Sequence, residues 1–238
     1  MSRNPREDVR LPGKLLVFEG IDRSGKTTQL KLLSQKLNAE GIKHRLLKFP
    51  CYETECGKML AAHLASHDAV RSRRSIHLLF SANRWEMMKE IVTTLMSGTH
   101  LLVDRYAFSG VAYSVGAENL SYDWCVVADD GLLSPDLVIY LDNPASVSAM
   151  RSNFGQERYE KECKLEGVRS VYKEFSSLPY WQTFDATMSK EELSDLIYEK
   201  VASVLRSESR RLYDAELHLP KEVSIKVNRD VHLVPPFA

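Results

Sequence analysis

The stretch Gly-Ile-Asp-Arg-Ser-Gly-Lys-Thr, residues 20–27, constrains the fold of this 238-residue chain more than any other segment. It fits the pattern G-x-x-x-x-G-K-[ST], in which glycines let the backbone curl so that successive N–H groups point at phosphate oxygens. The apolar run "KLLVFEG" precedes it and leucines at helical spacing follow it, so the loop joins a strand to a helix N-terminus. The pattern therefore predicts a nucleoside triphosphate site built from Gly20, Asp22, Arg23, Ser24, Gly25, Lys26, Thr27 and Thr28.

Apolar runs alternate with helical patterns along the rest of the chain. We expect a long helix from about residue 75 to 98, and strands at 14–20, 44–49, 100–105, 136–142 and 180–186. Alternation of strand and helix is the signature of an α/β fold with a doubly wound, mostly parallel sheet. Such sheets bind ligands beyond the carboxyl ends of their strands, where the motifs of this chain lie, so the sequence predicts one composite site.

The composition excludes several classes of partner. Lys+Arg and Asp+Glu both number 32, so no basic field attracts nucleic acid or an anionic membrane. The apolar runs are too short to span a bilayer, and the first 13 residues lack the apolar stretch of a secretory signal. The spacing of the cysteines does not match a zinc site or a redox pair, which favours reduced thiols. We therefore expect a cytoplasmic protein, with the nucleus as the alternative compartment, and no nucleic-acid or membrane partner.

A second group of charged residues is expected beside the phosphate-binding loop. Asp104 ends a hydrophobic strand, the usual place for a carboxylate that holds Mg²⁺, and the Thr27 hydroxyl supplies a second ligand. Arg105 offers a planar fork to a phosphate, although such a pair at a strand end is otherwise a structural ion pair. Arg23 could reach the transferring phosphoryl group from within the loop. The candidate catalytic residues are thus Arg23, Lys26, Asp104 and Arg105, and the candidate metal ligands are Thr27 and Asp104.

The segment "LLFSANRWE" places Phe80 and Arg84 four residues apart, on one face of a helix. A flat ring beside a forked hydrogen-bond donor suits a planar nucleobase. The alternative is an aromatic core stripe with an exposed arginine.

Taken together, "FEGIDRSGKTTQ", "KFP", "LLFSANRWE", "VDRYAFSGVAY", "PDLVIYLD" and "FGQERYE" resemble eukaryotic-type thymidylate kinases, which are P-loop nucleoside monophosphate kinases. These enzymes transfer the γ-phosphoryl group of ATP to thymidine 5′-monophosphate. The resemblance implies a P-loop α/β fold with a five-stranded parallel sheet, a short helical lid and a homodimer. It assigns residues 14–206 to the kinase domain, with the lid at about 151–161, and leaves 1–13 as an N-terminal extension. Residues 207–238 form a C-terminal extension that is either disordered or packed as an arm on the body or on a partner subunit.

The resemblance also assigns roles on the acceptor side. It places the thymine ring against Phe80 and its carbonyl on Arg84, with Ser109 and Gly110 at the base edge. Tyr113 would crowd the 2′ position and so select deoxyribose.

The same resemblance divides the remaining residues between sugar and phosphates. Asp22 would accept the 3′-hydroxyl with help from Tyr159, while Arg105 and Lys26 would bind phosphates on the two sides of the transfer. Arg23 would be the catalytic cation, supported by Arg151 and Arg158 from the lid. The expected acceptor site comprises Asp22, Lys48, Phe49, Tyr52, Phe80, Arg84, Arg105, Ser109, Gly110, Tyr113 and Tyr159; the lid arginines complete the expected ATP site.

The chain departs from the family pattern after its second strand. An arginine that binds the acceptor phosphate is expected two residues beyond "FP", but Tyr52 stands there. Losing a charge-assisted contact costs about 10- to 100-fold in binding. Either Lys48, Lys58 or another cation compensates, or the acceptor binds more weakly.

Two other functions are compatible with a phosphate-binding loop. One is a kinase for another deoxynucleotide or for a nucleoside, but a nucleoside kinase needs a base near the acceptor, and the sequence shows no obvious one. The other is a P-loop switch or an inactive nucleotide-binding protein. No asparagine precedes a lysine, as the N-K-x-D motif of GTPases requires, and the expected catalytic residues are all present.

Overall fold

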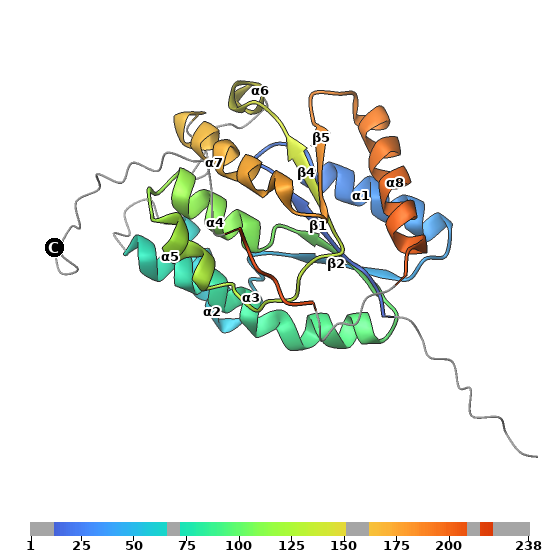
Figure 1. The fold of residues 1–238 in the computed structure, drawn as a ribbon, viewed down its shortest axis with the longest axis horizontal. Helices are drawn as coiled ribbons and strands as arrows, with labels where there is room; N and C mark the ends of the chain where they lie inside the picture. Colours follow the sequence, from blue (N-terminus) through green and yellow to red (C-terminus); the bar gives the residue numbers. More distant parts are fainter. Residues whose placement is uncertain (1–11, 66–71, 151–161, 209–214, 221–238) are drawn as a thin grey trace, which may run out of the picture.

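A computed structural model describes residues 12–65, 72–150, 162–208 and 215–220. One parallel sheet of five strands, in the order β2-β3-β1-β4-β5, forms its centre (Figure 1). Its strands are β1 (Leu15–Glu19), β2 (His44–Lys48), β3 (His100–Asp104), β4 (Leu137–Asp142) and β5 (Trp181–Asp185). Each predicted strand is present and shorter than expected by one or two residues, so the α/β prediction is confirmed.

Helices connect the strands and cover both faces of the sheet. They are α1 (Lys26–Ala39), α2 (Glu55–Ala65), α3 (Arg73–Met96), α4 (Ala107–Gly116), α5 (Tyr122–Val127), α6 (Ala145–Ala149), α7 (Glu162–Glu174) and α8 (Lys190–Arg206). The helix predicted from residue 75 to 98 is α3. It begins two residues earlier because Ser72 caps it, accepting a hydrogen bond from the Ser75 N–H.

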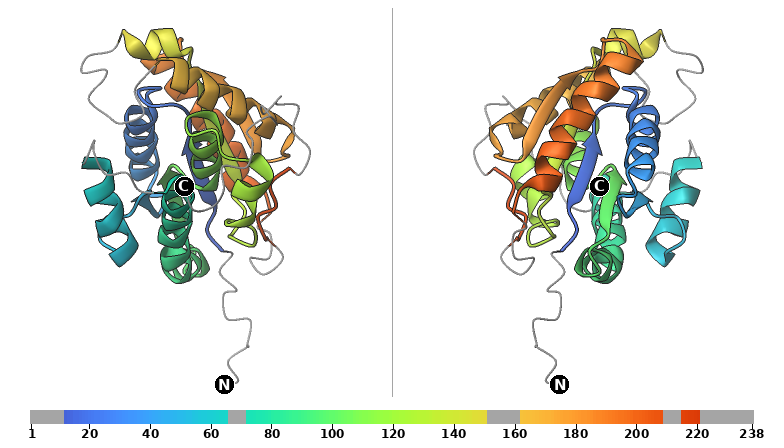
Figure 2. Two further views of the ribbon diagram at one scale, coloured as in Figure 1. Left: turned by 90° about the vertical axis from the view of Figure 1, so that its left-hand side faces the viewer. Right: turned by 90° about the vertical axis from the view of Figure 1, so that its right-hand side faces the viewer.

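Alternating side chains of β1 separate the two cores. Leu15 and Val17 face the core formed with α3, α4 and α7, while Leu16 and Phe18 face α1 and α8. All four side chains are fully buried, as expected for a central parallel strand. Figure 1 shows α1 and α8 together on one side of the sheet, and α2 packs against α3 at one margin of the molecule (Figure 2).

The register of the sheet brings three strand ends to the same level. Asp104 of β3 is the register partner of Phe18 in β1 and of Lys48 in β2. Glu19, the last residue of β1, is therefore next to the end of β3, which in turn pairs with the end of β2. The loops that leave these ends all open on one edge of the sheet, where the predicted site residues lie.

Residues 215–220 pack on the body of the molecule. The Leu217 N–H donates to the Leu132 carbonyl at 2.7 Å, and the Ser134 N–H donates to the Ala215 carbonyl at 2.7 Å. Leu217 is fully buried. This part of the chain beyond residue 206 thus covers the loop that follows α5.

Candidate active site

The loop between β1 and α1 needs its first glycine. Gly20 has φ 146°, and a Cβ there would lie 2.6 Å from Ser24 Oγ and 2.8 Å from the Leu141 carbonyl oxygen. Gly25, at the N-cap of α1, has φ 99° and makes no side-chain capping bond. The first N–H groups of α1 are therefore left without a side-chain cap, in the arrangement that binds a phosphate.

Lys26 folds back over this loop. Its ammonium donates to the carbonyl oxygens of Gly20 at 3.0 Å and Ile21 at 2.7 Å, and the side chain is buried. Burial lowers the pKa of Lys26 to about 8, and the nearby Arg105 guanidinium adds to the decrease. The two carbonyl oxygens hold the Lys26 ammonium in a buried position, where an anionic ligand would neutralise its charge.

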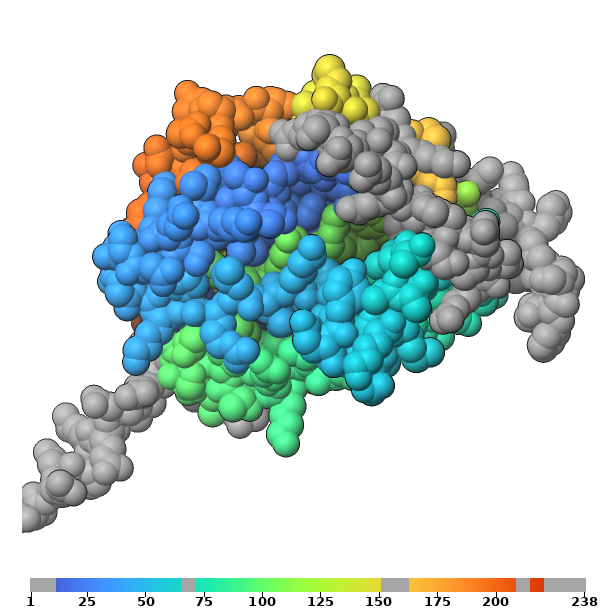
Figure 3. Space-filling view, turned by 180° about the vertical axis from the view of Figure 1, so that it is seen from behind, coloured from blue at the N-terminus to red at the C-terminus, as the bar shows by residue number. Residues whose placement is uncertain are grey.

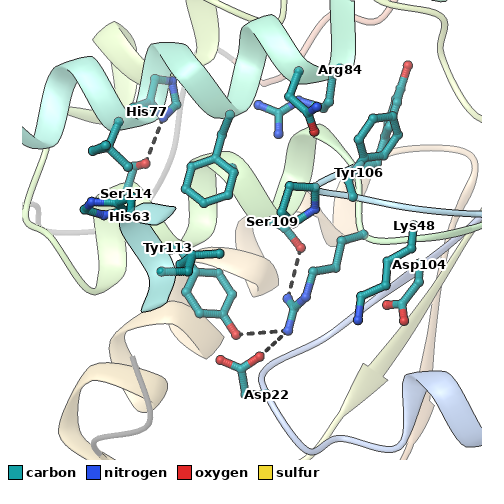
Figure 4. Close-up of a pocket in the computed structure, with 18 of the residues that line it drawn as sticks. Asp22, Lys48, His63, His77, Arg84, Asp104, Tyr106, Ser109, Tyr113 and Ser114 are labelled. Carbon is teal, nitrogen blue, oxygen red and sulfur yellow. Dashed lines mark hydrogen bonds and ion pairs between the residues drawn. The ribbon is translucent and has the colours of Figure 1, made fainter. Parts of the chain in front are cut away.

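Asp104 faces Thr27 across the loop. The Thr27 hydroxyl donates to Asp104 Oδ2 at 3.1 Å, whereas Oδ1 is buried and has no hydrogen-bond partner among the described residues. A buried carboxylate oxygen without a partner is costly unless a ligand occupies it. Lys48, the register partner of Asp104, lies alongside it in the same space (Figure 4).

Arg105 contacts the β1–α1 loop and helix α4 together. Its guanidinium forms an ion pair with Asp22 and donates to the Gly20 carbonyl at 3.3 Å and to Ser109 Oγ at 3.2 Å (Figure 4). It also lies 5.1 Å from the centre of the Tyr113 ring. Arg105 has φ 70° and Arg23 has φ 62°, so both arginines adopt a left-handed backbone that is rare outside glycine. Such conformations concentrate at functional sites.

Arg84 is held at the other end of the site by a residue that the sequence analysis did not single out. Its Nε donates to Asp129 Oδ1 at 3.0 Å and its Nη2 to Oδ2 at 2.6 Å, and both side chains are buried. Gly110 leaves room for this guanidinium, because a Cβ there would lie 2.6 Å from Arg84 Nη2. A bidentate pair of this kind fixes the plane of the arginine.

Other side chains on the same face of α3 bind the segment that carries Asp129. His77 Nε2 must donate to the Cys125 carbonyl at 2.9 Å, so its Nδ1 accepts from Ser114 Oγ at 2.8 Å. Burial lowers the pKa of His77, and the Arg84 charge adds to the effect, which keeps the ring neutral. Ser81 donates to the Ala128 carbonyl at 2.7 Å. The segment before Asp129 is thus fixed along α3.

Side chains from these elements line one cavity of about 410 Å³, and the space-filling view shows the surface hollowed between the blue α1 segment and the cyan α2 segment (Figure 3). The predicted residues that line it are Asp22, Arg23, Lys26, Thr27, Lys48, Phe49, Tyr52, Phe80, Arg84, Asp104, Arg105, Ser109, Gly110 and Tyr113. Gly20, Ser24 and Gly25 belong to the adjoining loop, and Thr28 lies in the first turn of α1. Arg151, Arg158 and Tyr159 lie outside the described residues.

Two observations add to the expectations for single residues. The Ser109 hydroxyl, expected at the base edge, donates to Glu19 and accepts from Arg105. His63 and His77 both line the cavity, although the sequence analysis did not single out any histidine. The position of His77 three residues before Phe80 on α3 is the signal that could have placed it there.

Comparisons with known proteins agree with this geometry. The sequence profile of the thymidylate kinase family matches residues 18–197. The chain is 43% identical to the thymidylate kinase of Plasmodium falciparum over 197 residues, covering 83% of this chain and 93% of the relative. It is 43% identical to the human thymidylate kinase over 185 residues, covering 77% and 87%.

The chain belongs to the thymidylate kinase family. A solved thymidylate kinase from Candida albicans superposes with a TM-score of 0.74 at 30% identity, covering 81% of this chain and 92% of that one. The resemblance inferred from the motifs and the P-loop fold are therefore confirmed, and the chain is an enzyme of the nucleoside monophosphate kinase class. Within the ranges that the structure describes, no helix is long and apolar enough to cross a membrane.

Replacing Asp129 should weaken acceptor binding specifically. Asp129→Asn removes the charge that orients Arg84, so we expect the KM for the acceptor to rise about 10-fold while the KM for ATP changes less than twofold. Steady-state kinetics with each substrate varied in turn measures both. Asp130→Asn is the matched control, because Asp130 is exposed and pairs with His218 at the surface. Equal changes in both constants, or in both variants, would contradict a role for Asp129 in orienting Arg84.

The low pKa of Lys26 predicts a pH effect on ATP use. The ammonium loses its proton as the pH rises through about 8, and with it the charge that favours phosphates. In the free enzyme, kcat/KM for ATP should therefore fall about 10-fold for each pH unit above that point. Lys26→Arg keeps its charge at high pH, so its profile should lack this falling limb. A wild-type profile that stays flat up to pH 9.5 would be inconsistent with a lowered pKa.

Proposed function

We propose that the cavity binds thymidine 5′-monophosphate, and that the γ-phosphoryl group of ATP passes to it in line, as a step of dTTP synthesis. One observation carries the proposal: a single cavity is lined by Phe80 and Arg84 of α3 and by Lys26 and Arg105 of the phosphate-binding elements, with Arg84 on the opposite side from Asp22 (Figure 4). A nucleoside monophosphate has the same order of groups, from base to phosphate.

The base end supports a pyrimidine acceptor. Phe80 lines the cavity and offers a ring face on which a base can stack. Arg84 uses Nε and Nη2 for Asp129, so Nη1 remains to donate to a base carbonyl. Because Gly110 has no side chain, the Arg84 guanidinium can lie directly beside its backbone.

The sugar and phosphate groups would lie between these ends. Asp22 would accept the 3′-hydroxyl, and Tyr113, whose ring packs on Arg105, would exclude a 2′-hydroxyl. Arg105 would bind the acceptor phosphate and Lys26 the phosphates of ATP. Arg23, which lines the cavity from the loop itself, would neutralise the charge that develops on the transferring group.

Magnesium fits the orphaned oxygen of Asp104. The Thr27 hydroxyl and Asp104 Oδ1 would hold the ion together with phosphate oxygens and water, an arrangement that Mg²⁺ prefers to a cage of protein ligands. In agreement, the described part of the chain contains no cluster of three or more His, Cys, Asp or Glu residues that could hold a metal alone. Bound there, Mg²⁺ would neutralise charge on the phosphates of ATP.

The transfer needs no strong base, because the acceptor phosphate is already an anion. Alignment and neutralisation of charge supply most of the acceleration. His77 is neutral and both its ring nitrogens are hydrogen-bonded, so it keeps the acceptor side in place and takes no proton. This distinguishes the site from that of a nucleoside kinase.

The family resemblance supports two further parts of the proposal. Residues 151–161 would form the lid over ATP, with Arg151, Arg158 and Tyr159 facing the nucleotides. Two copies of the chain would form a homodimer, and Leu78 and Trp85, exposed on the same face of α3, would supply apolar surface for it.

An ADP-release assay with ATP, Mg²⁺ and a panel of acceptors tests the assignment. We expect thymidine monophosphate to give the highest kcat/KM and deoxyuridine monophosphate the second highest, because Tyr113 disfavours ribose and the base site suits a pyrimidine. Lys26→Ala should release no ADP, which excludes a contaminating kinase. Since the Candida albicans relative is described as having a broad substrate specificity, the panel includes AMP, GMP, dGMP and free thymidine. Equal or faster turnover of AMP, GMP or free thymidine would refute the assignment, and light scattering of the same preparation tests the dimer.

A second experiment asks how the chain binds the acceptor phosphate with Tyr52 in place of an arginine. Lys48 lines the cavity beside Asp104, whereas Lys58 pairs with Glu55 at the surface, so the geometry favours Lys48 as the compensating cation. We expect Lys48→Ala to raise the acceptor KM about 10-fold and Tyr52→Arg to change it less than threefold. Lys58→Ala is the control and should leave the acceptor KM unchanged. A large gain from Tyr52→Arg together with no loss from Lys48→Ala would exclude compensation by Lys48.

A further inference from the structure

Glu19 connects the donor and acceptor halves of the site without lining the cavity. It is the last residue of β1, precedes Gly20 directly and is fully buried. Its Oε1 accepts from the N–H groups of Tyr106 at 2.8 Å and Ser109 at 3.2 Å. Its Oε2 accepts from the hydroxyls of Ser109 at 2.5 Å and Tyr172 at 2.9 Å.

Through these bonds Glu19 caps helix α4. Tyr106 is the N-cap residue of α4 and makes no side-chain capping bond, so the N–H groups of Tyr106 and Ser109 depend on Glu19. In a capping box these two N–H groups are satisfied by side chains of the helix itself. Here Glu19 of the neighbouring strand β1 satisfies them. This fixes the start of α4, and Arg105 just before it, to the residue that precedes the phosphate-binding loop.

Tyr172 brings helix α7 into this cluster. It is fully buried, and its hydroxyl lies 2.8 Å from Ser109 Oγ and 3.5 Å from the Gly20 carbonyl, in addition to its bond with Glu19. Glu19 Oε2 accepts hydrogen bonds from both hydroxyls, so neither hydroxyl proton is directed at Arg105. Ser109 Oγ then has a lone pair available for Arg105, which donates to it at 3.2 Å.

The backbone keeps Tyr172 in this place. Helices α4 and α7 cross at Gly116 and Gly167, where a Cβ on Gly167 would lie 2.4 Å from the Gly116 carbonyl oxygen. The Tyr172 ring is 5.1 Å from the ring of Tyr140. The hydroxyl is therefore held against Glu19 and Ser109 by packing on two sides.

We propose that Tyr172 is a positioning residue for phosphoryl transfer: through Glu19 and Ser109 it orients Arg105 toward the acceptor phosphate. This rests on the proposed role of Arg105. Tyr172 does not line the cavity, so its effect on the reaction passes through the other two side chains. Helix α7 follows residues 151–161 directly, and Tyr172 is the point at which this helix reaches the residues of both phosphate sites.

The test compares Tyr172→Phe with Tyr140→Phe. Tyr140 is equally buried in the same aromatic cluster, but its hydroxyl donates to Asp142 at 3.3 Å and not to the site. We expect Tyr172→Phe to raise the acceptor KM about 5- to 20-fold, with kcat changed less than threefold and the KM for ATP less than twofold. Tyr140→Phe should change none of these constants more than twofold. Melting temperatures should fall by similar amounts in both, which separates positioning from loss of stability.

A double-mutant cycle with Ser109→Ala tests the route of the effect. If Tyr172 acts through Ser109, adding Tyr172→Phe to Ser109→Ala should change the acceptor KM less than twofold further. Wild-type kinetics for Tyr172→Phe, equal kinetic losses in both tyrosine variants, or full additivity in the cycle would each overturn the proposal. Failure of thymidine monophosphate in the acceptor panel would refute the proposed substrate instead, because the cycle can be measured with whichever acceptor the enzyme uses.

Discussion

The site depends on holding cations in a cavity where water cannot fully solvate them. Arg84 is paired with Asp129, and Arg105 with Asp22, while the Lys26 ammonium is bound by loop carbonyl oxygens. Removing one partner of a buried charge leaves the other uncompensated, which costs several kcal/mol. The anionic partners are therefore as necessary to the site as the cations that face the ligand.

The site residues and their partners differ in how far they can be predicted from the sequence. The phosphate-binding loop is a local pattern that its spacing alone indicates. Phe80 and Arg84 are neighbours on one helix, but their spacing is also compatible with an aromatic core stripe, and only the resemblance to thymidylate kinases favours a base site. The five strands are equally local, because each is an apolar run bounded by turn residues. These elements can therefore be predicted from the local sequence, without knowledge of contacts between distant parts of the chain.

The partners of the site residues carry no such signal. Asp129 is 45 residues from Arg84, and the Asp-Asp-Gly sequence around it is typical of an ordinary turn. Tyr172 is 153 residues from Glu19, on a helix whose pattern indicates only a buried face. Both contacts exist because the sheet order and the crossing of α4 and α7 bring remote segments together. A single sequence specifies that arrangement only through the whole fold, so these residues could not be identified from local spacing.

The ion pair between Asp22 and Arg105 bears on the choice of acceptor. The same two residues would bind the 3′-hydroxyl and the phosphate of the acceptor, so in the absence of ligand each satisfies the other. A monophosphate would supply an anion for Arg105 and a hydroxyl for Asp22, so Arg105 would keep an anionic partner and Asp22 would gain a hydrogen-bond donor when the ion pair opens. A free nucleoside supplies only the hydroxyl, so Arg105 would either lose its anionic partner or keep Asp22 from the sugar. An unpaired, partly buried guanidinium is costly, and this cost disfavours the nucleoside without any steric clash. The charge balance of the site would thus select for a phosphorylated acceptor, while the proposed roles of Phe80, Arg84 and Tyr113 would select its base and sugar.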